Sequence, residues 1–290
     1  MSAELNKSYQ IVARDQMETG HSHIVDQMLM TLEGGNLRSV RLAVLNYFES
    51  NPDAKRELEY FLPWAEDEPD YIPVLTRIAV CYSELGDQEN ATNFWRLAHI
   101  EYAKSYFAKA KEFLYLSQNP RISLNKEEQK AEHLREAFES FRSAIKYDSC
   151  NSLYRREYAK ALSENGYQEQ AIKEAKLAID VEDSFENNLT LLNVYAYALQ
   201  MDEYKKIERE IERKFSDELS VRCWVAERNI KDGQYDTGIP MARAIFSKVS
   251  TLNSIKPDDR GFFELAELRK TISELFSTED APYSWNNAPC

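Results

Sequence analysis

Histidine and cysteine are the residue types in this chain best suited to metal or redox chemistry. His21 and His23 form an H-x-H pair, but a zinc site needs at least a third protein ligand, and none is evident near them. The four cysteines are widely spaced and form no C-x-x-C pair of the kind found in zinc or dithiol sites: Cys81, Cys150, Cys223 and Cys290. We therefore expect no metal site and no cofactor. Cys81 lies in the apolar stretch IAVCYSEL and is expected to be buried as a small hydrophobe.

Catalytic motifs are also missing from the sequence. It contains no G-x-x-x-x-G-K-[ST], H-E-x-x-H or G-x-S-x-G, the patterns of phosphate-binding loops, zinc proteases and serine hydrolases. With 49 acidic residues in the chain, pairs of carboxylates are too common to nominate an acid–base dyad. The sequence predicts a protein that is not an enzyme.

The charge balance narrows the class of partner. The formal net charge is -13, which repels phosphate backbones and anionic lipid surfaces. The chain opens on the polar stretch MSAELNKSYQIVARDQ, and no segment is apolar over the length of a membrane span. We expect a cytoplasmic protein that binds another protein or a peptide, with no nucleic acid and no membrane insertion. Its 17 Tyr, 13 Phe and 4 Trp are expected to fill the space between helices.

Helical periodicity dominates the chain, which has only 8 glycines and 9 prolines. The stretch 126–147 is typical, because its apolar residues recur at the three-and-four spacing of one helix face. No convincing run of period-two strands lies between turn signals. The predicted fold class is all-α.

Two of these helical stretches repeat one another. Residues 78–98 read I-A-x-x-Y-x-x-x-G-x-x-x-x-A-x-x-x-W-x-x-A, and residues 158–178 read Y-A-x-x-L-x-x-x-G-x-x-x-x-A-x-x-x-A-x-x-A. Seven positions align without a gap and four are identical, including the glycine expected in a turn between two helices. A third copy follows in register with Ala226, Gly233, Gly238 and Ala242.

This pattern resembles the tetratricopeptide repeat. The resemblance implies a right-handed solenoid of antiparallel helix pairs, with extra helices at both ends. A period of about 34 residues places six units at 38–71, 72–105, 118–151, 152–185, 186–218 and 219–252. The first helix of the third unit is expected earlier, near 103–116. The fifth unit has Gln200 at the expected turn position and Lys205 where a small residue is expected, and Pro63 should disturb the second helix of the first unit.

The domain prediction follows from these repeats. Residues 1–37 are expected to form N-terminal helices, and residues 38–252 about six helix pairs with a loop insertion near 117–125. Residues 253–277 are expected to form a capping helix that covers the last apolar face. Residues 278–290 are predicted to be a loose tail.

The resemblance also implies which residues line the inner groove, because the first helix of each unit lines it in this family. The third unit then contributes Lys104, Phe107, Lys111 and Leu114. The fourth contributes Leu153, Arg156, Lys160 and Ser163. The fifth contributes Asn187, Thr190, Val194 and Tyr197. Four of these residues are cations in an acidic protein, and the spacing within each pair places both cations on one helix face.

Two interpretations of these cations stay open. They could bind an acidic peptide segment together, or they could belong to solvated faces balanced by Glu101, Glu112 and Glu157. The carboxylate clamp of chaperone-binding relatives is not supported, because its asparagine and remaining cations are missing. The predicted function is a protein-interaction adaptor or scaffold that binds a peptide, an acidic one on the first interpretation. The alternative is a peptide-responsive regulator of the bacterial repeat-array type.

Overall fold

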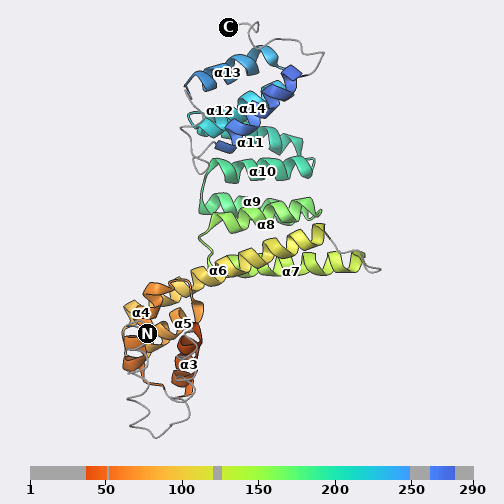
Figure 1. The fold of residues 1–290 in the computed structure, drawn as a ribbon. Coiled ribbons are helices and arrows are strands. Elements are labelled where there is room, and N and C mark those ends of the chain that lie inside the picture. Colours follow the sequence, from red (N-terminus) through yellow and green to blue (C-terminus); the bar gives the residue numbers. More distant parts are fainter. Residues whose placement is uncertain (1–36, 51, 120–125, 249–261, 278–290) are drawn as a thin grey trace. The chain divides into compact units, whose positions relative to one another are not determined.

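A computed structural model describes residues 37–50, 52–119, 126–248 and 262–277, and these residues form twelve α-helices and no β-strand (Figure 1). The chain divides into two compact units, 1–149 and 150–290, whereas the sequence predicts one repeat array over 38–252. The predicted N-terminal helices over 1–37 fall almost wholly outside the described residues, as do the tail 278–290, His21 and His23.

The described residues of unit 1 form five helices. They are α3 (Leu37–Ser50), α4 (Ala54–Asp67), α5 (Ile72–Glu84), α6 (Gln88–Gln118) and α7 (Lys126–Tyr147). Helices α3, α4 and α5 share one core, in which Phe48, Phe61 and Trp64 are almost fully buried. The sequence predicts that Pro63 disturbs α4, but the helix is continuous through this residue. Neighbouring aromatic side chains anchor it, because the rings of Phe61 and Trp64 lie 6.1 Å apart and Trp64 stacks on Tyr71.

Helix α6 corrects one predicted boundary. The sequence places the end of a repeat unit at residue 105 and the first helix of the next unit near 103–116, but α6 is one helix of 31 residues. No glycine or proline lies between Gln88 and Gln118, so nothing in the local sequence stops the helix. It packs along α7, with Ala98, Ala103 and Ala110 fully buried.

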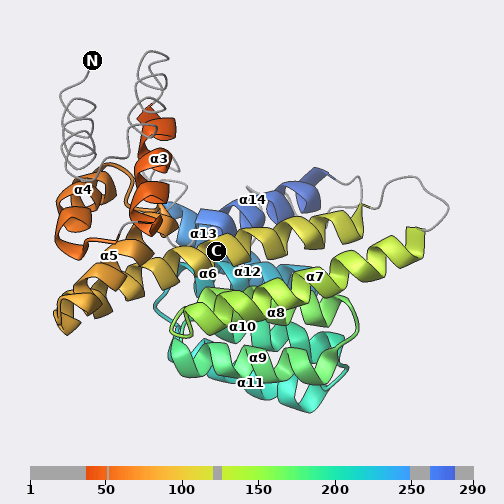
Figure 2. The same ribbon diagram turned by 90° about the horizontal axis from the view of Figure 1, so that it is seen from below.

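Seven helices lie in the described part of unit 2. They are α8 (Ser152–Glu164), α9 (Gln168–Val181), α10 (Phe185–Tyr197), α11 (Met201–Lys214), α12 (Leu219–Lys231), α13 (Tyr235–Lys248) and α14 (Phe262–Ser277). Figures 1 and 2 show consecutive antiparallel pairs, α8 with α9 and α10 with α11, and α10 packs against both helices of the preceding pair. The first helices α8, α10 and α12 begin 33 and 34 residues apart.

Four helix pairs share one turn geometry. In α5–α6, α8–α9 and α12–α13 a glycine takes the left-handed conformation, with φ of 81° at Gly86, 86° at Gly166 and 77° at Gly233. The amide of this residue donates to the carbonyl three residues earlier at 3.0–3.1 Å. The next amide donates to the carbonyl five residues earlier at 2.7–3.0 Å. These bonds cap the first helix of each pair as a Schellman motif, so the predicted turn glycines are confirmed.

The α10–α11 turn has the same two hydrogen bonds but no glycine. Leu199 takes the left-handed position with φ of 57°, so the sequence prediction that placed Gln200 there was one residue out of register. The position in the second helix where a small residue is expected is likewise occupied by Tyr204, and not by Lys205 as the sequence predicts. The cause is a 33-residue step between α8 and α10 where a period of 34 was assumed.

Helix α14 lies within the segment 253–277, where the sequence predicts a cap. It packs on α12, and Leu265 and Leu268 are fully buried in a cluster with Cys223 and Ile230. Helices α12 and α13 approach each other very closely at Gly238, where an added Cβ would lie 2.7 Å from the Ile230 side chain. This is why the third sequence copy has glycine where the others have alanine.

Candidate interaction surface

In unit 1 the four residues predicted to line the groove lie on α6, where Phe107 and Leu114 are partly buried. Lys104 is exposed and its Nζ pairs with Glu101 at 2.6 Å. The half-buried Phe107 ring packs edge-on against Phe141 of α7, so it contributes to the α6–α7 interface. Lys111 is exposed, with its Nζ 5.8 Å from the centre of the Phe107 ring.

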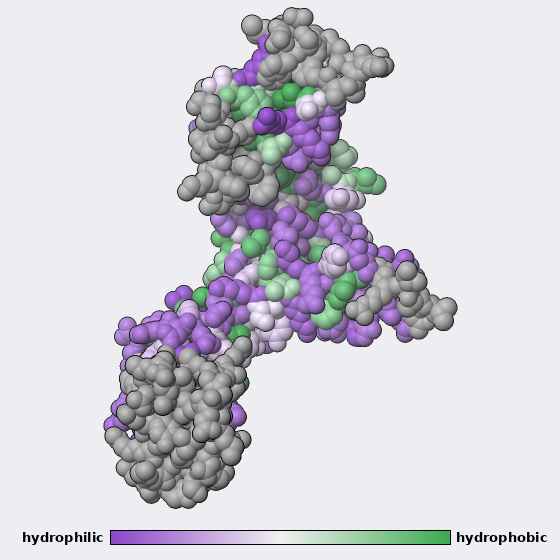
Figure 3. All heavy atoms as spheres, viewed as in Figure 1, coloured by the Kyte–Doolittle hydropathy of each residue, from purple (hydrophilic) through white to green (hydrophobic). Residues whose placement is uncertain are grey.

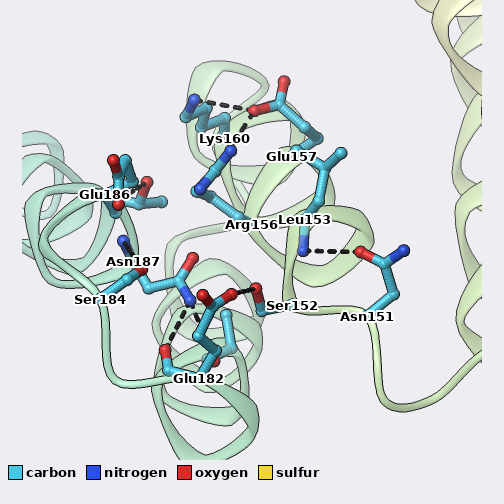
Figure 4. A network of polar contacts seen from close by, with 12 residues as sticks. Asn151, Ser152, Leu153, Arg156, Glu157, Lys160, Glu182, Ser184, Glu186 and Asn187 are labelled. Atoms are coloured by element: carbon cyan, nitrogen blue, oxygen red, sulfur yellow. Dashed lines mark hydrogen bonds and ion pairs between the residues drawn. The ribbon is translucent and has the colours of Figure 1, made fainter. Parts of the chain in front are cut away.

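In unit 2 the two predicted cations of α8 meet at one carboxylate (Figure 4). Lys160 Nζ lies 2.8 Å from Glu157 Oε1, and Arg156 Nε lies 3.7 Å from the same oxygen. The second distance is too long for a hydrogen bond. Arg156 Nε is buried and has no hydrogen-bond partner among the described residues. Arg156 and Lys160 therefore share a single acid of the same helix.

The fifth-unit prediction is wrong at Thr190. Its side chain is only 3% exposed, and its hydroxyl donates to the Glu186 carbonyl of its own helix at 2.9 Å. Asn187 and Val194, chosen by the same spacing, are also buried. The reason is the 33-residue step, which moves each equivalent position one residue earlier.

The corrected register gives a different set on α10. The positions equivalent to Leu153, Arg156, Lys160 and Ser163 are Glu186, Leu189, Asn193 and Ala196, all of which are at least partly exposed. The helix N-caps could have revealed them. Asn151 caps α8 and Ser184 caps α10, and these cap residues are 33 apart, as a search for cap signals would have found.

A polar joint holds α8 and α10 beside each other (Figure 4). Ser152 donates from Oγ to Glu182 Oε2 at 2.6 Å. The buried Asn187 amide donates to the carbonyls of Ala178 and Glu182 at 3.2 and 2.6 Å, each of which also accepts a backbone amide at the end of α9. Ser152 of α8 and Asn187 of α10 both bind Glu182, so these contacts fix the spacing between the exposed faces of the two helices.

The equivalent face of α12 is covered. Its residues at these positions are Ser220, Cys223, Glu227 and Ile230, of which Ser220, Cys223 and Ile230 are buried. Thr271 of α14 donates to Glu227 Oε1 at 3.2 Å. The exposed first-helix face of unit 2 is therefore formed by α8 and α10.

Two searches of the described part of the chain were negative. No group of three or more His, Cys, Asp or Glu residues in the described ranges could hold a metal ion. Within the same ranges, no helix has both the length and the apolar character needed to cross a membrane.

Comparison with known proteins finds similarity to solved structures only, since no family model and no curated protein matches. The chain aligns with TTC0263, a thermophilic TPR protein of Thermus thermophilus, at 15% identity and a TM-score of 0.35, covering 62% of this chain and 92% of that one. It aligns with yeast Tom70 at 14% identity and a TM-score of 0.34, covering 94% and 84%. With the APC/C hetero-tetramer Cut9–Hcn1 the identity is 14% and the TM-score 0.34, and the chain spans less than half, 46%, of the aligned chain.

All three TM-scores are low, so the fold assignment rests on the geometry of the chain itself. Four interhelix turns share one hydrogen-bond pattern, and three first helices of unit 2 follow one another at 33 and 34 residues. Both features are those of the repeat inferred from the sequence. The described chain is an all-α protein built from tetratricopeptide-like helix pairs.

Proposed function

We propose that this protein is an interaction scaffold and that the exposed face of α8 and α10 binds an extended peptide segment carrying acidic side chains. The observation that carries the proposal is Arg156, whose Nε is buried without a hydrogen-bond partner among the described residues. A guanidinium offers five N–H donors in a rigid fork that fits a carboxylate. The Arg156 side chain as a whole is 20% exposed, so an acidic side chain from a partner can pair with the guanidinium.

The surroundings of Arg156 support the same chemistry. Lys160 lies one helical turn further along α8 and shares Glu157 with Arg156, so α8 offers two cations and one acid to a partner, beside the partly exposed Glu186 of α10. Leu153 and Leu189 are partly exposed on the two helices and offer apolar contact on either side of the cations. Lys104 and Lys111 on α6 of unit 1 are a separate candidate, and Lys104 already pairs with Glu101.

Binding of labelled peptides to the full chain tests the proposal. A peptide containing aspartate and glutamate should raise the fluorescence anisotropy of its label on addition of protein, and the same peptide with asparagine and glutamine should not. The double variant Arg156→Glu, Lys160→Glu should weaken binding at least about tenfold, because hydrogen bonds to charged groups contribute about 1.5–3 kcal/mol each. Binding should also weaken as salt is added.

A matched control separates this site from general electrostatics. Lys173 is an exposed lysine on α9, and Lys173→Glu makes the same charge change per residue away from α8. Binding should be unaffected by this variant, and circular dichroism should show the same helicity for all three proteins. Equal binding of acidic and neutral peptides, or equal loss in both variants, would contradict the proposal.

A further inference from the structure

The α10–α11 turn carries large apolar side chains where the matching turns are polar. The α5–α6 and α8–α9 turns both follow the pattern E-x-G-x-Q, with Glu84 to Gln88 in one and Glu164 to Gln168 in the other. The α10–α11 turn has Tyr197, Leu199 and Met201 at these three positions. All three point into solvent, with exposed fractions of 63%, 82% and 49%.

Leu199 is unfavourable in two independent ways. Its φ of 57° is left-handed. This conformation is energetically unfavourable for an L-residue that has a Cβ, and the other turns place glycine there. Its side chain is also the most exposed of the large hydrophobic residues in the described chain. Backbone strain combined with an exposed apolar side chain is typical of a site that contacts another molecule.

The apolar surface is wider than this one turn. Tyr167, in the neighbouring α8–α9 turn, is 46% exposed, and both turns lie at the same end of their helices (Figure 1). Figure 3 shows a hydrophobic protrusion at that edge, at the level of α10 and α11. We call Tyr167, Tyr197, Leu199 and Met201 the turn-edge patch.

Carboxylates neighbour the turn-edge patch in the sequence, with Lys205 and Lys206 one turn further along α11. The first turns of α9 and α11 carry Glu169, Asp202 and Glu203, and Glu164 ends α8. The last turns of α8 and α10 contain no basic residue. A partner with lysine or arginine beside an apolar face would complement this rim.

We infer that the turn-edge patch is a second docking surface, distinct from the α8–α10 face, for an amphipathic segment of another protein whose apolar face is flanked by lysine and arginine. A second copy of this chain fits less well, because it would bring two acidic rims together and the chain carries a net charge of -13. An anionic lipid surface is disfavoured by the same charge.

The test uses the full chain and a synthetic amphipathic helix with one leucine face flanked by lysines. A second peptide has glutamates in place of the lysines. The key variant, Tyr197→Glu, Leu199→Gly, Met201→Gln, installs the residues of the α8–α9 turn. Wild-type protein should bind the lysine peptide, and the variant should bind it at least tenfold more weakly, while circular dichroism shows an unchanged fold. Leu199→Gly alone should weaken binding and at the same time raise the melting temperature, which a folding defect cannot do.

Two further measurements locate the binding. Hydrogen exchange of the wild-type complex should show protection at the α10–α11 turn, and Arg156→Glu, Lys160→Glu should bind the lysine peptide as tightly as wild type. The inference is overturned if neither peptide binds, if the glutamate peptide binds equally well, or if the triple variant binds like wild type. Sedimentation that shows a dimer dissociated by the triple variant would also overturn it, in favour of self-association.

Discussion

The α8–α9 and α10–α11 pairs of unit 2 form the same interhelix turn from different residues. Gly166 takes the left-handed position in the first pair and Leu199 in the second, and the two hydrogen bonds that close the turns have nearly equal lengths. The second helices differ as well, because buried Ala171 corresponds to half-buried Tyr204. The comparison teaches that the turn geometry is set by how two helices pack, and that glycine lowers its cost without being required.

Exchanging the second-helix residue should have the largest effect. Ala171 is fully buried against α8, so Ala171→Tyr, which copies Tyr204 into the tighter pair, should overpack the interface by about 3 kcal/mol. We expect the melting temperature to fall by roughly 6–12 °C, measured by circular dichroism. Tyr204→Ala, the reverse exchange, should be milder because Tyr204 is only half-buried. Equal effects would show that the two pairs are packed alike.

Replacing the turn glycine comes next. A Cβ at Gly166 would meet nothing within 4 Å, so Gly166→Ala tests conformational cost alone. It should destabilise the chain by about 1–2 kcal/mol, the cost of a left-handed L-residue, and lower the melting temperature by several degrees. An unchanged melting temperature would mean that the turn tolerates a side chain without strain, and Leu199 would then need no explanation.

The opposite exchange should stabilise the protein. Leu199→Gly removes a left-handed side chain but adds flexibility to the unfolded chain, so the net gain should be about 0.5–1 kcal/mol. The expected rise in melting temperature is about 2 °C. A fall would show that the exposed Leu199 side chain makes a stabilising contact.

The smallest effect concerns the residue after the turn. Asp87 caps α6, because its side chain accepts hydrogen bonds from the side chain and the backbone amide of Asn90. These hydrogen bonds lower the pKa of Asp87 below its usual range. At the matching position of the α8–α9 turn, Tyr167 gives α9 no such cap. The stabilisation by Asp87 is present above the usual aspartate pKa of about 3.9 and is lost as pH falls through the lower folded pKa. The variant Asp87→Ser keeps a capping side chain that does not titrate. The difference in melting temperature between this variant and wild type should therefore become smaller as pH falls from 5 to 3. A gap that stays constant over this range would contradict the assignment.

Much of the fold could be predicted because it depends on local chemistry. Gly86 and Gly166 follow the ends of the helices α5 and α8, and the alanines three, four and seven residues apart mark the faces that must pack closely. Cys81 is buried, as the sequence predicts, and burial, together with its contact with the Glu57 carboxylate, raises the pKa of its thiol to about 12.

The candidate site was less predictable because it depends on register. Arg156 and Lys160 are at least partly exposed on α8, but the spacing carried from one unit to the next was wrong by one residue, which selected the buried Thr190. On a helix, one residue turns a side chain by about 100°. Cap residues such as Ser184 indicate the register of each unit more accurately than an average repeat length does.

The sequence by itself determined the helical class, the close-packed alanine faces and the three glycine turns, since each follows from preferences acting within a few residues. Only the tertiary structure decided that Leu199 would take the left-handed turn and expose its side chain. No local preference favours that conformation for leucine. It persists because the packing of α10 against α8, α9 and α11 holds the chain at both sides of the turn and offsets the strain.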